Sequence, residues 1–492
     1  MIKTRIAPSP TGNLHVGTAR TALFNYLFAR HHNGEFLLRI EDTDIKRSEK
    51  RYEEEIIEGL TWLGISWDGH IVRQTERLDS YEKYVKQLLK EGKAFYCFHT
   101  EEELENDRKN QMEHKMVIRH FCASWRDVPF KEAEKKRKAG ENSIIRFKIP
   151  RTPENHQIVF DDIIRGQVRF FTGPLGDFPI AKDFRVPLYN FAVVIDDFEM
   201  EISHVIRGED HIPNTPKQLL IAEALGFISK DNGGVFRPPW EYAHLPLILG
   251  PDRSKLSKRH GATSIQEYRD DGYLADALFN FLALLGWNPG TEKEIFSRAE
   301  LIELFSLDRV QKSGAIFDVT KLNWMNNQYI GKKLPEELRM LAIPYIGNFL
   351  QNQKLKIKDQ NEYIEQILAL EQSRITKLSE LPEQVEYFFK QPTYEKELLR
   401  WKSMSDEELK NALAAAKKTI ENIPEEHWNK EYIESAFLKE AATYTNRGEL
   451  LWPLRVALSG KKASPGPFEI MAILGKQTTL RHIQHALDLL VL

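Results

Sequence analysis

Two short stretches of the sequence carry residue types that could grip a triphosphate. Residues 7–18 hold Gly12, His15 and Gly17 between a strand-like segment and a helical pattern. Glycine lets the backbone approach a ligand closely, the unpaired N–H groups of a helix N-terminus favour phosphate, and a histidine can add a proton or a positive charge. Residues 255–259 add two lysines and an arginine around one serine. Together the two stretches predict a nucleotide-binding site.

Strand and helix patterns alternate around the first stretch. Residues 2–7 and 35–41 have the character of strands, and residues 17–31 and 48–63 carry apolar side chains at helical spacing. Strand–helix–strand–helix order predicts a parallel sheet. A glycine turn between the first strand and its helix is typical of a nucleotide-binding α/β unit.

The pattern becomes polar and mixed from about residue 86 to residue 187. This segment contains a charge run at 132–138 and short strand patterns at 143–148 and 166–171. We interpret it as an insertion that folds separately within the sheet domain. Residues 191–195 and 202–206 are again apolar and β-branched, so we expect two strands there that close the sheet.

Helical periodicity dominates after about residue 325. Three apolar stripes illustrate it, at 363–370, 409–416 and 480–490. No low-complexity tract or repeat is recognisable in this part. The sequence therefore predicts an all-α C-terminal region.

Length and composition limit the number of domains and the class of protein. The 492 residues are enough for roughly three domains of ~150 residues each. The net charge of −3 neither favours nor excludes nucleic acid, because basic residues can be confined to a contact surface. No apolar run approaches the ~18 residues of a membrane span, and a Pro-Ser-Pro-Thr-Gly loop stands where a signal peptide needs its apolar core. We expect a cytoplasmic protein without a membrane partner.

The motifs, taken in order, resemble those of bacterial glutamyl-tRNA synthetases, which are class I aminoacyl-tRNA synthetases. Residues 7–20 and 255–259 are similar to the two class I signatures of that family. Further matches are residues 36–44, 189–192 with 196–197, 206–211, 314–318, 321–324 and 454–476. The resemblance implies an α/β fold with a Rossmann-like catalytic domain in two halves (1–85 and 188–250), an inserted α+β acceptor-stem-binding domain (86–187), a stem-contact region (251–325) and an all-α anticodon-binding region (326–492).

The same resemblance implies ATP-dependent activation of L-glutamate and its transfer to the terminal adenosine of tRNA(Glu). The attacking carboxylate is already ionised, so the enzyme needs in-line positioning and donors that strengthen as charge moves onto the leaving phosphates. We expect His15 and Lys258 to be catalytic. Alone, His15 could be a helix cap and the basic stretch a solvated loop. The ATP-binding residues implied by the resemblance are Pro10, Thr11, Gly12, His15, Gly17, Lys255, Ser257, Lys258 and Arg259.

Glutamate needs cations for its carboxylates and an anion for its amino group. The resemblance implies a glutamate site made of Arg5, Ala7, Ser9, Glu41, Tyr189 and Arg207. Glu41 suits the ammonium group, and Arg5 and Arg207 suit the carboxylates; which arginine takes which carboxylate stays open. The alternative is a set of structural salt bridges.

Both cysteines of the chain stand beside histidines in the insertion. Cys97 and His99 form one pair and His120 and Cys122 the other, with one residue between the members of each pair. Two such pairs on facing strands or knuckles could hold zinc tetrahedrally. Some members of the family carry a structural zinc in this insertion, usually with a Cys-x-Cys first pair, from which His99 departs. Two buried thiols beside two surface histidines are an equally open alternative.

Partners and cofactors follow from the resemblance. They are tRNA(Glu), L-glutamate and ATP with Mg²⁺, whose main ligands would be ATP oxygens, and the chain is expected to be a monomer. Arg374 lies where discriminating members read the last anticodon base, although a solvent-facing helical arginine is an alternative. Charging of tRNA(Gln) therefore stays open.

Three other functions fit these residues less well. A glutaminyl-tRNA synthetase would show alternating strands near its C-terminus, and a tRNA-independent nucleotidyltransferase would have no use for the helical region. A catalytically dead RNA-binding paralogue would not need His15, Lys258, Arg5 and Glu41 intact.

Overall fold

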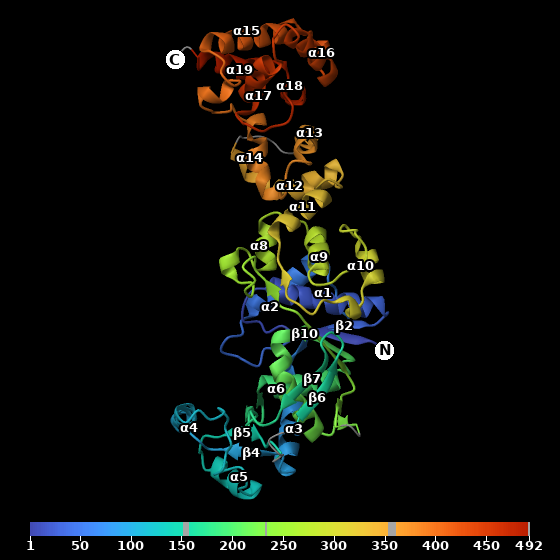
Figure 1. Ribbon diagram of the computed structural model, residues 1–492, viewed down its shortest axis with the longest axis vertical. Helices are drawn as coiled ribbons and strands as arrows, with labels where there is room; N and C mark the ends of the chain where they lie inside the picture. Colours follow the sequence, from blue (N-terminus) through green and yellow to red (C-terminus); the bar gives the residue numbers. More distant parts are fainter. Residues whose placement is uncertain (151–156, 232–233, 353–360, 491–492) are drawn as a thin grey trace. The chain divides into compact units, whose positions relative to one another are not determined.

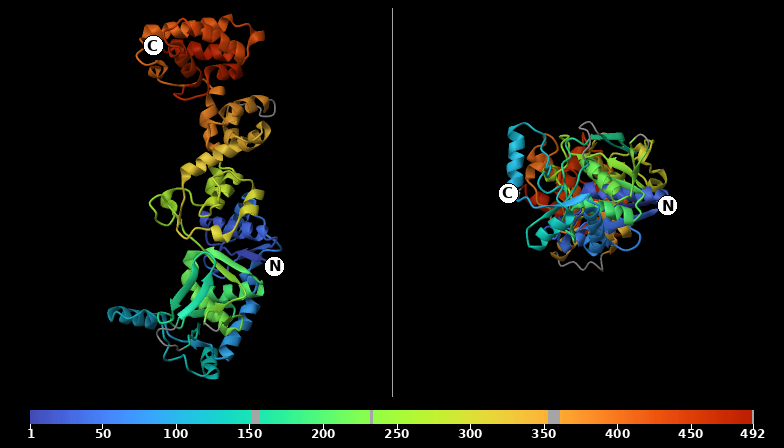
Figure 2. Two further views of the ribbon diagram at one scale, coloured as in Figure 1. Left: turned by 45° about the vertical axis from the view of Figure 1, so that its right-hand side comes forward. Right: turned by 90° about the horizontal axis from the view of Figure 1, so that it is seen from below.

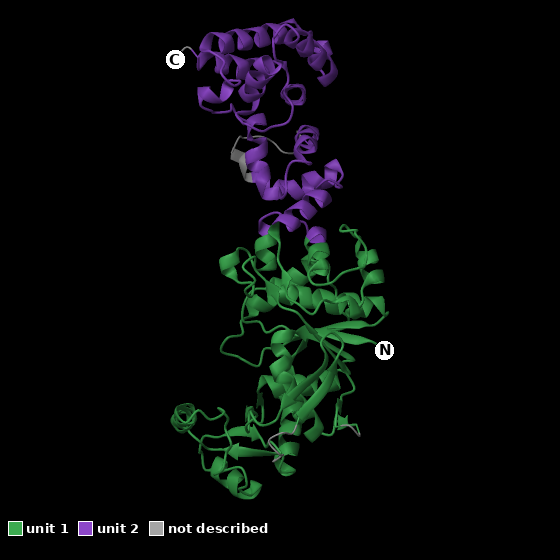
Figure 3. Ribbon diagram, viewed as in Figure 1, with its two compact units in different colours: residues 1–268, 278–319 green, residues 269–277, 320–492 purple. Residues whose placement is uncertain are grey.

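The computed structural model describes residues 1–150, 157–231, 234–352 and 361–490, which belong to two compact units (Figure 1, Figure 3). Unit 1 consists of Met1–Tyr268 and Leu278–Val319, and unit 2 consists of Arg269–Ala277 and Thr320–Leu492. Each unit is described by itself below.

Unit 1 begins with the predicted parallel sheet. Strands β1 (Lys3–Ile6), β2 (Glu35–Ile40) and β3 (Val72–Arg73) pair in parallel in that order, and helices α1 (Val16–His31) and α2 (Lys50–Trp62) follow β1 and β2. Leu23, Phe24 and Leu27 of α1 are fully buried, as their helical spacing predicted. The expected strand–helix–strand–helix start is confirmed.

A second sheet has the order β10-β13-β6-β7, with β10 at His204–Gly208, β13 at Glu241–Leu245, β6 at Gln157–Asp162 and β7 at Gly166–Phe171 (Figure 1, Figure 2). Strands β6 and β7 come from the segment interpreted as a separately folded insertion, yet β6 pairs with β13 through Asp162 and Tyr242. The interpretation that residues 157–171 fold separately from the sheet domain is therefore wrong. Side chains alternate along β6, so that Ile158 and Phe160 are buried on one face. An apolar sheet face must pack against another element, and other parts of unit 1 cover this one.

The expected strand at 191–195 is wrong, because these residues lie inside helix α6 (Tyr189–Glu199). Five consecutive apolar residues, each at most 3% exposed, are buried on all sides. A continuous apolar run is compatible with a buried strand and with a buried helix. The sequence pattern does not distinguish the two, and packing in the folded protein does. The expected strand at 202–206 is confirmed as β10, shifted by two residues.

The rest of the middle segment forms an antiparallel sheet with flanking helices. Its strands are β4 (Ala94–Cys97), β5 (Ile144–Phe147), β8 (Pro179–Asp183) and β9 (Val186–Pro187), and its helices are α3 (Leu78–Lys90), α4 (Glu101–Glu113) and α5 (Phe130–Lys138). The charge run at 132–138 lies in α5. One hydrophobic core joins this sheet to α6 and α7 (Thr215–Ala224).

The remaining elements of unit 1 lie mostly after the second sheet. They are β11 (Ser229–Lys230), β12 (Phe236–Arg237), β14 (Ile248–Leu249), β15 (Ala315–Ile316), α8 (Ile265–Asp270), α9 (Ala275–Leu284) and α10 (Arg298–Leu304), of which α8 and α9 have a few residues in unit 2.

The described part of unit 2 is helical, which confirms the predicted all-α region. Its helices are α11 (Val319–Ile330), α12 (Pro335–Asn352), α13 (Asn361–Glu371), α14 (Leu381–Val385), α15 (Asp406–Asn422), α16 (Lys430–Ala441), α17 (Gly448–Ser459), α18 (Pro467–Leu474) and α19 (Lys476–Asp488). Leu409, Leu413 and Ala416 of α15 are fully buried in the common core. Among the described residues, no helix combines the length and the apolar character that crossing a bilayer requires.

A buried charge network joins the first sheet of unit 1 to α6. The fully buried guanidinium of Arg39 on β2 lies 2.7 Å from the Asp197 carboxylate and 3.1 Å from that of Glu41. Arg5 on β1 lies 2.9 Å from the same Asp197. Burial alone raises the pKa of the Asp197 carboxyl, but the charges of Arg5 and Arg39 outweigh burial and hold this pKa well below its usual range.

We predict that Asp197→Asn lowers the free energy of unfolding by about 3–5 kcal/mol, because it leaves two buried guanidinium groups short of a counter-charge. Because the pKa of Asp197 is lower in the folded state than in the unfolded one, its contribution is complete above about pH 4 and is lost as the pH falls. Denaturant unfolding at pH 7 and at low pH measures both effects. The surface pair Asp44–Arg47 provides the control Asp44→Asn, which should unfold like the wild type; equal stability of Asp197→Asn and this control would contradict the prediction.

Candidate active site

A hollow of about 750 Å³ lies where β1 and β10 end. Ligands of open α/β sheets bind at the carboxyl ends of the strands. The predicted residues that line the hollow are Arg5, Ala7, Ser9, His15, Gly17, Glu41, Tyr189, Arg207 and Lys255. The predicted residues that are not part of its lining are Pro10, Thr11, Gly12, Ser257, Lys258 and Arg259.

His15 is both a helix cap and part of the hollow. Its Nδ1 accepts a hydrogen bond of 3.0 Å from the backbone N–H of Gly17 in the first turn of α1. Burial, and after it the charge of Lys255, lowers the pKa of His15. The imidazole is therefore neutral near pH 7, and its Nε2–H is left as a donor. His15 thus caps the helix, and this cap is compatible with a ligand contact at Nε2.

The basic stretch is a loop that is anchored at one buried residue. Leu256 is 7% exposed, and its backbone N–H donates to the carbonyl of Ile248 on β14. Lys255 and Lys258 on either side of it are exposed, and Lys255 lies 3.5 Å from the carboxylate of Asp210. Lys258 is therefore open to solvent, whereas Lys255 lines the hollow beside Asp210.

The two arginines of the predicted glutamate site have different partners. Arg5 is neutralised by its ion pair with Asp197, whereas Arg207 donates only to neutral atoms, namely Thr215 Oγ1 at 2.8 Å and His244 Nε2 at 3.1 Å. Within the described residues, no carboxylate pairs with Arg207. Its positive charge is therefore the one that a ligand carboxylate could neutralise.

Sequence reasoning missed several residues of the hollow. His211 lines it and hydrogen-bonds to the Tyr189 hydroxyl at 2.8 Å, and Asp210 and Asn214 also line it. All three lie in or beside residues 206–211, which carried part of the family resemblance. Their position three to seven residues after Arg207 on the chain was the available signal.

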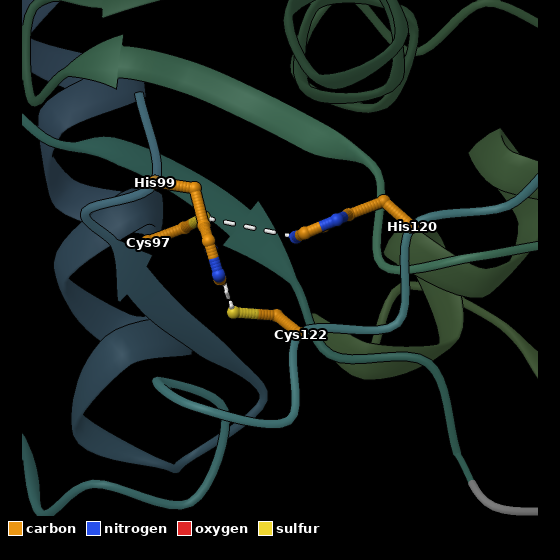
Figure 4. Close-up of side chains that lie close together, drawn as sticks. All are labelled: Cys97, His99, His120 and Cys122. Atoms are coloured by element: carbon orange, nitrogen blue, oxygen red, sulfur yellow. Dashed lines mark hydrogen bonds between the residues drawn. The ribbon is translucent and has the colours of Figure 1, made fainter. Parts of the chain in front are cut away.

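The cysteine–histidine cluster is assembled in the middle segment (Figure 4). The Sγ atom of Cys97 lies 3.3 Å from His99 Nδ1, 3.8 Å from His120 Nε2 and 3.9 Å from Cys122 Sγ. Ligand atoms held tetrahedrally by zinc at about 2.0–2.3 Å are about 3.3–3.8 Å from one another. The four ligand atoms all lie within 4.8 Å of one another, which is close to the spacing of a zinc site.

The surroundings of this cluster favour a thiolate at Cys97, whereas the hydrogen bond to Cys97 and burial raise the pKa of the Cys122 thiol. Both cysteines are fully buried, and Asp177 accepts a hydrogen bond from the Cys122 backbone N–H. A hydrogen bond from Cys122, together with those from the two histidines, lowers the pKa of the Cys97 thiol. Thiolate is the form that binds metal.

A second hollow, of about 610 Å³, lies in unit 1 and is basic. Arg119, Arg146, Arg169 and Lys217 line it, and none of them forms an ion pair with a carboxylate of the described residues. Arg146 is only 6% exposed, donates to the backbone carbonyl of Asp177, and has a buried Nε without a hydrogen-bond partner there. Phe171 at its edge is 57% exposed.

Arg374 lies in unit 2, just after α13. Its Nε is 3.1 Å from the buried carboxylate of Glu371, and about a third of its side chain is exposed (35%). Burial and the nearby charge of Arg374 lower the pKa of Arg455. The guanidinium of Arg374 is thus oriented and lies close to a second cation.

Comparisons with known proteins agree with this geometry. Residues 1–324 match the family model "tRNA synthetases class I (E and Q), catalytic domain", and residues 337–487 match "Anticodon binding domain". The chain is 45% identical to the glutamate–tRNA ligase of Carboxydothermus hydrogenoformans and 45% identical to that of Aquifex aeolicus, over 99% of both chains in each case. A solved glutamate tRNA ligase from Elizabethkingia meningosepticum, in complex with its amino acid, is 33% identical with a TM-score of 0.85 over 99% of both chains. The chain belongs to the glutamate–tRNA ligases, a family of class I tRNA synthetases.

Proposed function

We propose that this chain uses ATP to activate L-glutamate and transfers the glutamyl group to the terminal adenosine of tRNA(Glu). The observation that carries the proposal is the 750 Å³ hollow, whose lining combines His15, Gly17 and Lys255 with Arg5, Glu41 and Arg207.

At the phosphate end, the proposed roles follow from the charge that develops during the reaction. The glutamate carboxylate attacks the α-phosphorus of ATP, and pyrophosphate leaves with additional negative charge. His15 would donate its Nε2–H to that charge, and the ammonium groups of Lys255 and Lys258 would also donate to it. Mg²⁺ would be held mainly by ATP oxygens.

At the amino-acid end, we assign the side-chain carboxylate of glutamate to Arg207. Arg5 already has a carboxylate partner in Asp197, and Arg207 has none in the described structure. Glu41 would bind the ammonium group, and Tyr189 would close the site. Glutamine would be rejected because its neutral amide leaves the charge of Arg207 without a partner.

We propose the basic hollow as the place where the inserted segment steers the single-stranded acceptor end of tRNA. Four cations without carboxylate partners suit phosphates, and the exposed ring of Phe171 suits a stacked base. Pro213, Pro216 and Lys217 line this hollow, while His211 and Asn214 of the same stretch line the larger one. One short stretch of chain thus separates the two hollows.

Two further assignments complete the proposal. A structural zinc would be held by Cys97, His99, His120 and Cys122, which fit it by their spacing and by the lowered pKa of Cys97. It would hold residues 97–99 against residues 120–122 and take no part in the reaction. Arg374 would read the last anticodon base, supported by its fixed orientation and its neighbour Arg455.

Aminoacylation of tRNA(Glu) and tRNA(Gln) transcripts tests the main proposal, with glutamate and glutamine as alternative amino acids. We expect glutamate on tRNA(Glu), and charging of tRNA(Glu) alone if Arg374 discriminates. Lys258→Ala should lower the rate about 10²–10³-fold, because one donor to the leaving phosphates is lost. The chain would need another function if neither tRNA were charged or if glutamine were preferred, and near wild-type activity of Lys258→Ala would refute its role.

The zinc site is tested by metal analysis of protein purified without a histidine tag. We expect one zinc per chain in the wild type and loss of zinc in His99→Ala, together with a lower Tm. His114→Ala is the matched control, because His114 is an exposed histidine of the same segment outside the cluster. A wild type without stoichiometric zinc would remove the site from the proposal.

The acceptor-end assignment is tested with the double variant Arg169→Ala/Lys217→Ala. We expect a roughly tenfold higher KM for tRNA(Glu). The slope of log K for tRNA binding against log salt concentration should be about 1.4 less steep, because each phosphate contact with a single strand contributes about 0.7 to this slope. The matched control is Lys131→Ala/Lys135→Ala, which removes two cations of α5 outside the hollow. Equal effects of both double variants would contradict a specific role of the hollow.

A further inference from the structure

A chain of hydrogen bonds between buried side chains of three strands ends on Arg207. The Oδ2 atom of Asp162, the last residue of β6, lies 2.6 Å from Nδ1 of His244 on β13. Nε2 of His244 lies 3.1 Å from Nε of Arg207 on β10. The residues are 4%, 0% and 6% exposed, respectively. Water therefore has little access to either hydrogen bond of this Asp162–His244–Arg207 chain, which is called the relay below.

The chemistry of the three groups fixes the direction of both bonds. A guanidinium only donates, so Nε2 of His244 must accept the hydrogen from Arg207. The imidazole proton is then on Nδ1 and is donated to the Asp162 carboxylate. Burial, with a further contribution from Arg207, lowers the pKa of His244 to about 4, although Asp162 opposes this shift. His244 is thus neutral at pH 7 and present as a single tautomer.

The relay orients Arg207 without cancelling its charge. Nε is held by His244 and Nη2 by Thr215 Oγ1, while Nη1 has no hydrogen-bond partner among the described residues. A carboxylate placed directly on Arg207 would neutralise the guanidinium, as Asp197 does for Arg5. The neutral imidazole of His244 is held by Asp162 and in turn holds Arg207. Because the imidazole carries no charge, the positive charge of Arg207 remains available to a ligand in the hollow.

Asp162 is itself fixed by the turn that follows β6. Its Oδ1 accepts the backbone N–H of Ile164 at 3.0 Å and of Arg165 at 2.8 Å, and its Oδ2 accepts the backbone N–H of His244 at 3.1 Å. The anchor of the relay is therefore rigid and belongs to residues 157–171, the part of the middle segment that joins the second sheet.

We propose that Asp162 and His244 are positioning residues for glutamate selection, which hold the guanidinium of Arg207 at the angle that a side-chain carboxylate requires. The inference rests on the proposed function, because it takes glutamate as the ligand of Arg207. It adds two residues that do not line the hollow and reach the substrate only through Arg207.

The test compares His244→Leu, which has no hydrogen-bonding group, with His244→Gln, whose amide offers an NH2 donor group and a carbonyl acceptor. We expect His244→Leu to raise the KM for glutamate at least about tenfold, with the KM for ATP within about twofold, because a misplaced binding group costs affinity only at its own ligand. The preference for glutamate over glutamine should fall in parallel. His244→Gln should recover most of both effects.

His204→Leu is the matched control, because His204 is another buried histidine, on β10, that lies outside the relay. It should leave the KM for glutamate unchanged even if it lowers the Tm. If His244→Leu does not fold, Asp162→Asn is measured by the same criterion. An unchanged KM for glutamate, or an equal rise for ATP, would overturn the inference while charging of tRNA(Glu) by the wild type would still support the proposed function. A wild type that does not charge tRNA(Glu) would instead refute the proposed function.

Discussion

The buried carboxylate of Asp197, held between Arg5 and Arg39, is the constraint on which the described architecture of unit 1 depends. The two arginines stand on neighbouring strands and the aspartate on α6, so the ion pairs fix the helix against the sheet. Buried charges are tolerated only when they are paired and hydrogen-bonded. This requirement makes the arrangement specific: a shift of β1, β2 or α6 would leave a charge without a partner.

The hollow uses two ways of holding an arginine. Arg5 is neutralised by a direct carboxylate, and Arg207 is oriented by the neutral groups of Thr215 and His244. The difference decides which guanidinium is available to an anionic ligand. A site that must bind a carboxylate and reject an amide needs the second arrangement, since only an uncompensated charge distinguishes the two.

The sequence predicted the fold where periodicity was unambiguous. The helices of unit 2 were found because their apolar residues recur at helical spacing, and the first strands and helices of unit 1 were found because their patterns alternate along the chain. The predicted strand at 191–195 was wrong, because a fully buried run in which every residue is apolar shows no periodicity that distinguishes a helix from a strand. Residues 157–171 were assigned to a separate insertion because strand pairing across a long stretch of chain, such as Asp162 with Tyr242, leaves no local signal.

The sequence by itself determined the residue types that the proposed chemistry uses: the glycine turn, the basic stretch, the charged residues of the proposed glutamate site and the pairs of cysteine and histidine. These depend on residue types at short spacings, which are local information. Only the tertiary structure decided which arginine keeps its charge, that His15 is a neutral donor, that Asp162 reaches Arg207 through His244, and that four side chains separated by up to 25 residues lie at the spacing of a zinc site. The physical reason is that charge compensation, tautomers and metal geometry depend on distances between atoms that are far apart in the chain, and folding alone sets these distances.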